Sequence, residues 1–169
     1  YMLQASLRAD AADLAMLPAS NRWGYFPAVS AGWSVSEEKF FEPLKKHISS
    51  LKLRASWGQN GSLAALGGYT YSTDMALGGI YPFVPGNITG AAPTSMGNED
   101  LKWETSEQIN VGIDARFLND RLTFSLDYFD KKTKDLLVNG TTPSLIVGGK
   151  TSPMNAGNVS NKGWEIELG

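Results

Sequence analysis

Residues 101–130 read LKWETSEQINVGIDARFLNDRLTFSLDYFD, and apolar and polar side chains alternate along both halves of this stretch. A period of two is typical of a β-strand with one apolar and one polar face. Asn119 and Asp120 separate the halves, and both residue types tolerate the positive φ of a tight turn. The stretch therefore predicts an antiparallel hairpin with a two-residue turn.

This turn also predicts the register of the hairpin. It pairs residues of like character across the strands: Phe117 with Leu122, Ala115 with Phe124, Ile113 with Leu126 and Val111 with Tyr128 on the apolar face, and Arg116 with Thr123 and Asp114 with Ser125 on the polar face. A slip of one residue would mix the two faces.

The apolar face of the hairpin has a limited height. It runs from Phe117 to Ile109 and then gives way to polar residues at the same level on both strands, namely Glu107, Thr105, Asp130, Lys132 and Lys134. Nine tilted residues span roughly 23 Å, close to the apolar band of a transmembrane β-barrel. Leu101 and Trp103 lie above this zone, where we expect them to pack against loops.

Four further stretches alternate in the same way and predict strands: 1–9, 25–36, 50–58 and 158–169. Residues 37–49 predict a short amphipathic helix capped by Ser36, until Pro43 interrupts it. The other connections, 10–24, 59–98 and 131–157, are long and rich in small and polar residues. Long connections alternate with shorter ones, as in an up-and-down barrel whose loops are elaborated at one end.

Composition excludes several classes of function. The 169 residues carry 15 basic and 17 acidic side chains, so a nucleic-acid partner is not expected. The chain has no cysteine, which excludes a disulfide framework and a thiol nucleophile. No stretch reaches the roughly 18 apolar residues of a membrane helix. Both ends fall inside alternating stretches, so we expect the chain to be a piece of a longer protein.

Two other interpretations fit the alternation. A soluble β-sandwich also has one face on a core and one in water, and it would bind glycans through exposed aromatic residues. A β-sandwich glycosidase would use Asp114 and Asp127 as paired acids. The single histidine, His47, lies in a polar connection beside Lys45 and Lys46, so we expect it to be exposed. We therefore predict no catalytic residue, no metal site and no cofactor.

Several segments, in order, resemble a known family. They are Arg8-x-Asp10, FPAVSAGWSVSEEKFF (26–41), SLKLRASWGQNG (50–61), GNEDLKWETSEQINVGIDARFLNDRLTFSLDYFDKKTKDLL (97–137) and NAGNVSNKGWEIEL (155–168). This order is similar to the barrel region of TonB-dependent outer-membrane transporters of the SusC/RagA type. After Asp10 the chain departs from the Gly-Ser-Ser-Arg-Phe-like stretch usual in that family.

The resemblance implies an all-β fold. Residues 1–169 would form an antiparallel up-and-down segment of a transmembrane β-barrel with about six strands, long extracellular loops and short periplasmic turns. The plug domain and the TonB-contacting segment would lie outside this chain. The parent protein would be a multi-pass barrel in the Gram-negative outer membrane that takes up oligosaccharides or peptides. Its partners would be TonB, a SusD-like surface lipoprotein and outer-membrane lipid, and it would not be an enzyme.

Three groups of residues are then candidates for function. Lipid-facing residues would be Ile109, Val111, Ile113, Phe117, Leu122, Phe124 and Leu126. Lumen-facing residues would be Arg54, Asp114, Arg116 and Asp127. Contacts to substrate or to a lid protein would come from the aromatic residues Trp23, Tyr69, Tyr71, Tyr81 and Phe83, with loops 59–98 and 131–157 contributing to the extracellular mouth. Tryptophans on the apolar strand faces would anchor the membrane interface or pack in a core.

Overall fold

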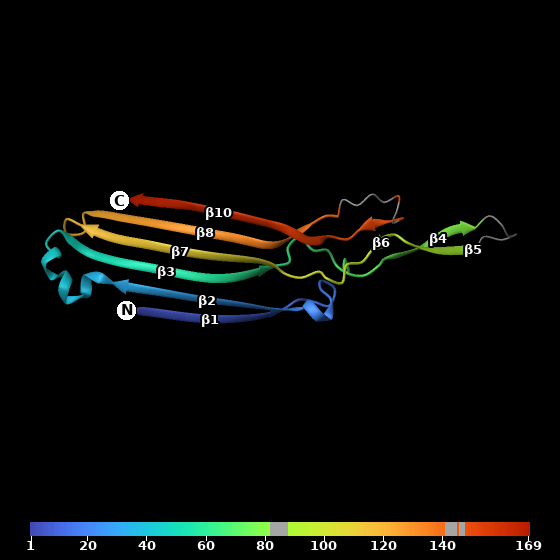
Figure 1. The fold of residues 1–169 in the computed structure, drawn as a ribbon, viewed down its shortest axis with the longest axis horizontal. Coiled ribbons are helices and arrows are strands. Elements are labelled where there is room, and N and C mark those ends of the chain that lie inside the picture. Colours follow the sequence, from blue (N-terminus) through green and yellow to red (C-terminus); the bar gives the residue numbers. More distant parts are fainter. Residues whose placement is uncertain (82–87, 141–144, 146–147) are drawn as a thin grey trace.

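In the computed structural model the described residues are 1–81, 88–140, 145 and 148–169, and for 79–81 and 88–89 only the backbone is described. Six long strands form one antiparallel sheet (Figure 1). They are β1 (Met2–Ala11), β2 (Trp23–Ser34), β3 (Ile48–Ser62), β7 (Glu104–Phe117), β8 (Leu122–Val138) and β10 (Met154–Leu168). Their order in the sheet follows their order in the chain, so the predicted up-and-down topology is confirmed.

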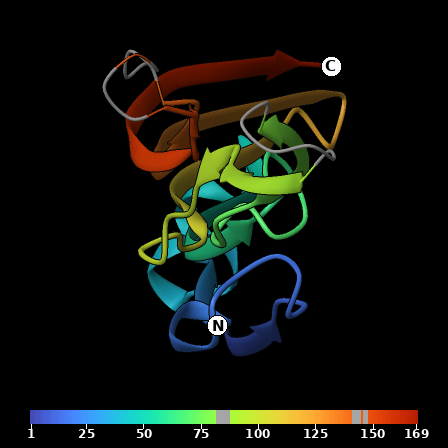
Figure 2. The same ribbon diagram turned by 90° about the vertical axis from the view of Figure 1, so that its right-hand side faces the viewer.

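The smaller elements lie in the connections. They are the 3-10 helices η1 (Ala19–Asn21), η2 (Val35–Glu37) and η3 (Lys39–Leu44), the hairpin of β4 (Met75–Tyr81) with β5 (Ile88–Pro93), and the short parallel pair of β6 (Ser95–Met96) with β9 (Lys150–Thr151). The longest loops gather at one end of the sheet, from which the β4–β5 hairpin projects (Figure 1). Viewed from that end, β1 and β10 form opposite edges of the sheet (Figure 2).

The central hairpin has the predicted register. Phe117 pairs with Leu122, Ile113 with Leu126 and Glu107 with Lys132. The turn is longer than predicted, because the strands end at Phe117 and Leu122 and leave four residues between them. Leu118 takes a positive φ of 55° in addition to Asn119 and Asp120, so the left-handed backbone begins one residue early.

The strands are also longer than their alternating stretches. β3 continues to Ser62 and β8 to Val138, which shortens the predicted loops 59–98 and 131–157. Backbone hydrogen bonds form a strand ladder whatever the side chains are, so pairs such as Gln59 with Glu107 extend it beyond the apolar zone.

The predicted helix at 37–49 is wrong, because two short 3-10 helices stand there instead. Glu38 between them has extended backbone angles, φ −83° and ψ 144°, and interrupts any continuous helix. Ser36 caps neither helix. Val35 and Phe41 are both buried, so the connection folds around its own apolar side chains.

Both faces of the sheet lack a covering layer in the described part of the chain. Of the buried apolar residues there, only Phe26 and Ala115 belong to the six long strands. The others lie in the connections: Ala12, Leu17, Val35, Phe41, Leu66 and Leu101. A sandwich would bury one face of each sheet between layers. The soluble sandwich interpretation therefore does not describe this arrangement.

Candidate functional site

One face of the sheet, called the apolar face here, carries all seven residues predicted to face lipid. Cross-strand pairing continues this face over the whole sheet, for example from Ile166 through Leu126 and Ile113 to Leu53. Val111 is 48% exposed and Ile109 is 41% exposed although both lie on inner strands. Ile113, Phe117, Phe124 and Leu126 are half-buried against neighbours on the same face. The sheet thus presents a broad apolar surface that the described residues do not cover.

Aromatic residues stand at the short-connection end of the apolar face. The ring of Trp33 stacks on Tyr1 at 6.0 Å between centroids, and Phe40 meets it edge-on at 6.4 Å. Trp33 Nε1 donates a hydrogen bond to Glu38 Oε1 at 3.1 Å. Hydrogen bonds from Tyr1 and Trp33 hold the pKa of the Glu38 carboxyl below its usual range. The Trp33 indole therefore has an apolar ring packed against Tyr1 and Phe40 and a hydrogen-bonded N–H group.

A second aromatic group stands at the long-loop end of the apolar face. Trp57 Nε1 donates to Glu107 Oε1 at 2.9 Å, and the rings of Tyr128 and Trp164 lie 4.7 Å apart. Charged residues begin in the next rows, as the sequence predicts. Two belts of amphipathic aromatic side chains thus bound the apolar face, and such belts are characteristic of membrane–water interfaces.

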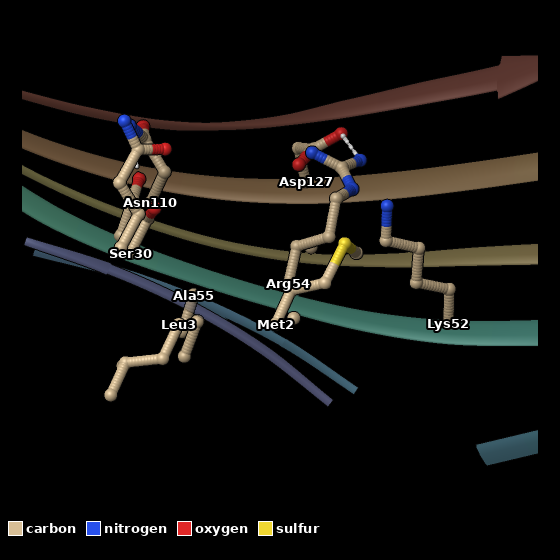
Figure 3. Close-up of a pocket in the computed structure, with 13 residues that line it drawn as sticks. Met2, Leu3, Ser30, Lys52, Arg54, Ala55, Asn110 and Asp127 are labelled. Carbon is tan, nitrogen blue, oxygen red and sulfur yellow. Dashed lines mark hydrogen bonds and ion pairs between the residues drawn. The ribbon is translucent and has the colours of Figure 1, made fainter. Parts of the chain in front are cut away.

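The opposite face, called the polar face here, carries a charge cluster that joins three strands. Arg54 on β3 binds Asp114 on β7 with two hydrogen bonds, Nε to Oδ2 at 2.6 Å and Nη2 to Oδ1 at 2.8 Å. Arg54 Nη2 also reaches Asp127 Oδ2 on β8 at 3.0 Å (Figure 3). Ser125 donates to Asp114 Oδ1 at 2.8 Å. One guanidinium therefore bridges two carboxylates and cancels half of their combined charge.

Gly112 makes the contact between Arg54 and Asp127 possible. It lies between Arg54 and Asp127 in the strand ladder. A Cβ at position 112 would overlap Asp127 Oδ1 and lie 3.0 Å from Arg54 Cζ. Any side chain at this position would push the guanidinium and the carboxylate apart. The sequence places all three charged residues on one face, but it does not reveal that they meet across a glycine.

The cluster supports a prediction about stability. Replacing Arg54 with methionine should destabilise the folded barrel by about 1 to 2 kcal/mol, because two carboxylates lose their partner while remaining 38% and 28% exposed to water. Urea unfolding in lipid vesicles measures this loss. Adding Asp114→Asn and Asp127→Asn should recover most of it. A triple variant as unstable as the single one would contradict the pairing.

Next to the charge cluster, the polar face is lined by neutral hydrogen-bonding groups together with the charged side chain of Lys131. A hollow of about 450 Å³ is lined by hydroxyl and carboxamide side chains that include Gln4, Ser30, Ser56, Gln108 and Asn110. Lys52 and Arg54 are among the residues that line a neighbouring hollow of about 420 Å³ (Figure 3). In that view Leu3 and Ala55 point away from Asn110 and Arg54, which shows the two faces directly. Arg116 lines a third hollow on the polar face.

At the long-loop end, the connections pack into a small apolar core, called the loop cluster here. Its buried members are Ala12, Leu17, Leu66 and Leu101, with Met16, Leu63, Tyr71, Trp103 and Leu137 packed against them. Asn21 Nδ2 donates to the Leu101 carbonyl at 3.0 Å, and Asn155 Nδ2 donates to the carbonyls of Lys102 at 3.0 Å and Asp135 at 2.7 Å. The expectation that Leu101 and Trp103 pack against loops is confirmed.

The predicted substrate-contacting aromatic residues lie in different settings. Trp23 is the first residue of β2 and is 60% exposed. Tyr71 packs against the loop cluster and donates to the Leu14 carbonyl at 2.9 Å, while Tyr69 beside it is 55% exposed. Tyr81 ends β4, where only the backbone is described, and Phe83 lies outside the described residues. Among the three whose side chains are described, Tyr69 and Tyr71 lie together, with ring centroids 6.5 Å apart.

Other kinds of site find no support in the described residues. They contain no group of three metal-ligating side chains, and none of their helices is long and apolar enough to cross a membrane. His47 is exposed, as expected. Asp114 and Asp127 are both bound to Arg54, so an ion-pair role accounts for their proximity.

Comparison with known proteins assigns the two-faced sheet to a family. A model of the family described as "TonB dependent receptor-like, beta-barrel" matches residues 1–169. The chain belongs to this TonB-dependent receptor family. Its members are outer-membrane β-barrel proteins, so this sheet is part of an outer-membrane barrel wall that is not closed within these residues.

Individual relatives agree with this assignment. TonB-dependent receptor P39 of Formosa agariphila is 36% identical over 168 residues, which are 99% of this chain and 15% of that protein. SusC of Bacteroides thetaiotaomicron is 32% identical over 174 residues, 99% of this chain and 17% of SusC. A structure of the RagAB peptide importer in the "open-open" state superposes with a TM-score of 0.83 and 26% identity, over 98% of this chain and 17% of that one. The chain thus spans about a sixth of the length of these relatives.

Proposed function

We propose that this chain forms part of the barrel wall of an importer that takes up oligosaccharides or peptides and is energised through TonB. The observation that carries the proposal is the family match over residues 1–169, which falls on a sheet with one apolar and one polar face. The plug domain and the TonB-contacting segment belong to the remainder of the protein. Similarity to SusC and to the RagAB peptide importer supports this function.

In this proposal the apolar face contacts lipid and the polar face lines the lumen. The aromatic residues that bound the apolar face support this assignment, because the boundary lies at different positions on neighbouring strands. Trp33 on β2 pairs with Leu53 and so stands level with Ile113, in the middle of the hairpin. On β7 the apolar face continues to Phe117. The boundary thus crosses the strands diagonally, as expected when strands tilt by roughly 40° from the membrane normal.

The loop cluster and the β4–β5 hairpin stand at the extracellular mouth. There, loops 59–98 and 131–157 meet the substrate and a SusD-like surface lipoprotein. Tyr69 is the best supported contact among the described aromatic residues, because it is exposed. Its neighbour Tyr71 instead anchors the loop through a hydrogen bond to the Leu14 carbonyl. Trp23 is a weaker candidate for such a contact, since strand alternation places it on the same, apolar face as Val29. No part of the proposal requires catalysis, and the relatives are named as receptors or importers.

Uptake by living cells tests this function. Cells lacking the gene for the full-length protein should lose uptake of one class of labelled substrate, either oligosaccharides or short peptides. Loss should be reversed by the intact gene and should also follow removal of TonB. Unchanged uptake of both classes would refute the proposal. Purification in mild detergent should yield the barrel together with a surface lipoprotein, and a barrel that is always isolated alone would refute that partner.

A further inference from the structure

Three lysines lie together on the apolar face, just beyond the aromatic belt at its long-loop end. Lys132 and Lys134 follow each other on the same side of β8, and Lys162 on β10 pairs with Asp130 of β8. The next row toward the centre of the sheet holds the Tyr128–Trp164 aromatic pair. The three amino groups therefore lie at the level where the apolar surface ends, on two neighbouring strands. They are called the lysine cluster here.

The lysine cluster directs its positive charge outward. The lysine side chains are 50% to 55% exposed, whereas Asp130 is 13% exposed and Glu107 is 25% exposed. Asp130 Oδ2 lies 3.0 Å from Lys162 Nζ and 3.8 Å from Lys132 Nζ, and Glu107 Oε2 lies 3.2 Å from Lys134 Nζ. Trp57 Nε1 donates a hydrogen bond to the other carboxylate oxygen of Glu107, Oε1. The two carboxylates thus sit beneath three ammonium groups, which leaves a net positive charge at the surface.

We propose that the lysine cluster binds the phosphate of an anionic lipid in the leaflet at the long-loop end of the barrel. Lysine stems lie along apolar surface while their amino groups reach into the headgroup layer. Aromatic belts mark the depth of that layer, and Trp57, Tyr128 and Trp164 stand there. The occupant is a lipid because acyl chains would contact the apolar face directly below the phosphate. The inference rests on the proposed assignment of that face to lipid.

Native mass spectrometry of the full-length protein tests the site. Protein in detergent is titrated with phosphatidylglycerol or with phosphatidylcholine of identical acyl chains. The intact protein should retain phosphatidylglycerol more strongly. The triple variant Lys132→Gln, Lys134→Gln, Lys162→Gln should weaken that retention by roughly fivefold per lysine removed. A matched triple variant at the opposite end, Lys39→Gln, Lys45→Gln, Lys46→Gln, should leave it unchanged.

A second variant separates a phosphate site from a network that only stabilises the strands. Asp130→Asn with Glu107→Gln removes the two carboxylates and should increase retention of phosphatidylglycerol, whereas loss of a purely structural network would decrease it or leave it unchanged. Inorganic phosphate at millimolar concentration should not displace the lipid, and full displacement would show a free-anion site and overturn the proposal. Equal retention by the intact protein and the lysine variant would also overturn it. A barrel that retains neither lipid would instead refute the lipid assignment of the apolar face.

Discussion

Replacing Ile113 with lysine should destabilise the membrane-inserted barrel by about 2 to 4 kcal/mol, because the side chain lies at the middle of the apolar face. Its neighbours across the strands are Leu53 and Leu126, which offer no partner for a charge. The cost arises from placing an ammonium group in hydrocarbon, where neither water nor a carboxylate is within easy reach. Folding of the full-length protein into lipid vesicles, followed by urea titration, measures the loss.

The matched control for this substitution lies three residues away on the other face. Asn110→Lys introduces the same charge beside Ser56 and Gln108, where it faces polar groups and the proposed lumen. It should cost less than about 1 kcal/mol, since only weak side-chain hydrogen bonds are lost. If both lysine variants fold equally well, or if Asn110→Lys is the worse of the two, the assignment of the faces is wrong.

Replacing Leu101 with alanine should destabilise the loop cluster by about 2 to 5 kcal/mol, because Leu101 is completely buried among side chains from several connections. The transmembrane strands do not depend on this residue, so the cluster should open locally while the barrel stays folded. Hydrogen exchange should accelerate in segments 12–22 and 63–71, which supply residues of this cluster and the Asn21 hydrogen bond to it. Exchange in the middle of β7 should not change.

An exposed leucine provides the control for this cavity. Leu3→Ala removes the same atoms from a side chain that is 80% exposed on β1, and it should leave hydrogen exchange in the loops unaltered. Unchanged loop exchange in the Leu101 variant would show that the cluster contributes little to ordering the mouth. Accelerated exchange over the whole barrel would show instead that the loops and the strands unfold as one unit.

Residues 101–130 illustrate what the local alternation of side chains can and cannot predict. Alternation placed Ile113 and Leu126 on one face, and the turn at Asn119–Asp120 paired them correctly because a register slip would bury charges. The same pattern underestimated the lengths of β3 and β8. It depends on side-chain polarity, whereas strand pairing depends on backbone hydrogen bonds. It also predicted a helix where Glu38 adopts an extended conformation.

The charged residues of the polar face show a different limit. Alternation placed Arg54, Asp114 and Asp127 on one face, yet nothing in their spacing shows that one guanidinium binds both carboxylates. These contacts join residues 60 and 73 positions apart in the chain. They depend on β3, β7 and β8 being neighbours and on the absence of a side chain at Gly112.

The sequence by itself determined where the six long strands lie, their two faces and the height at which the apolar face of the central hairpin ends. These properties are local, because side chains in an extended chain point alternately to opposite sides. Only the tertiary structure decided which distant side chains meet, in the Arg54 cluster, the loop cluster and the lysine cluster. Those contacts arise when strands far apart in the chain pair in register, and the positions of their side chains then follow from the sheet as a whole.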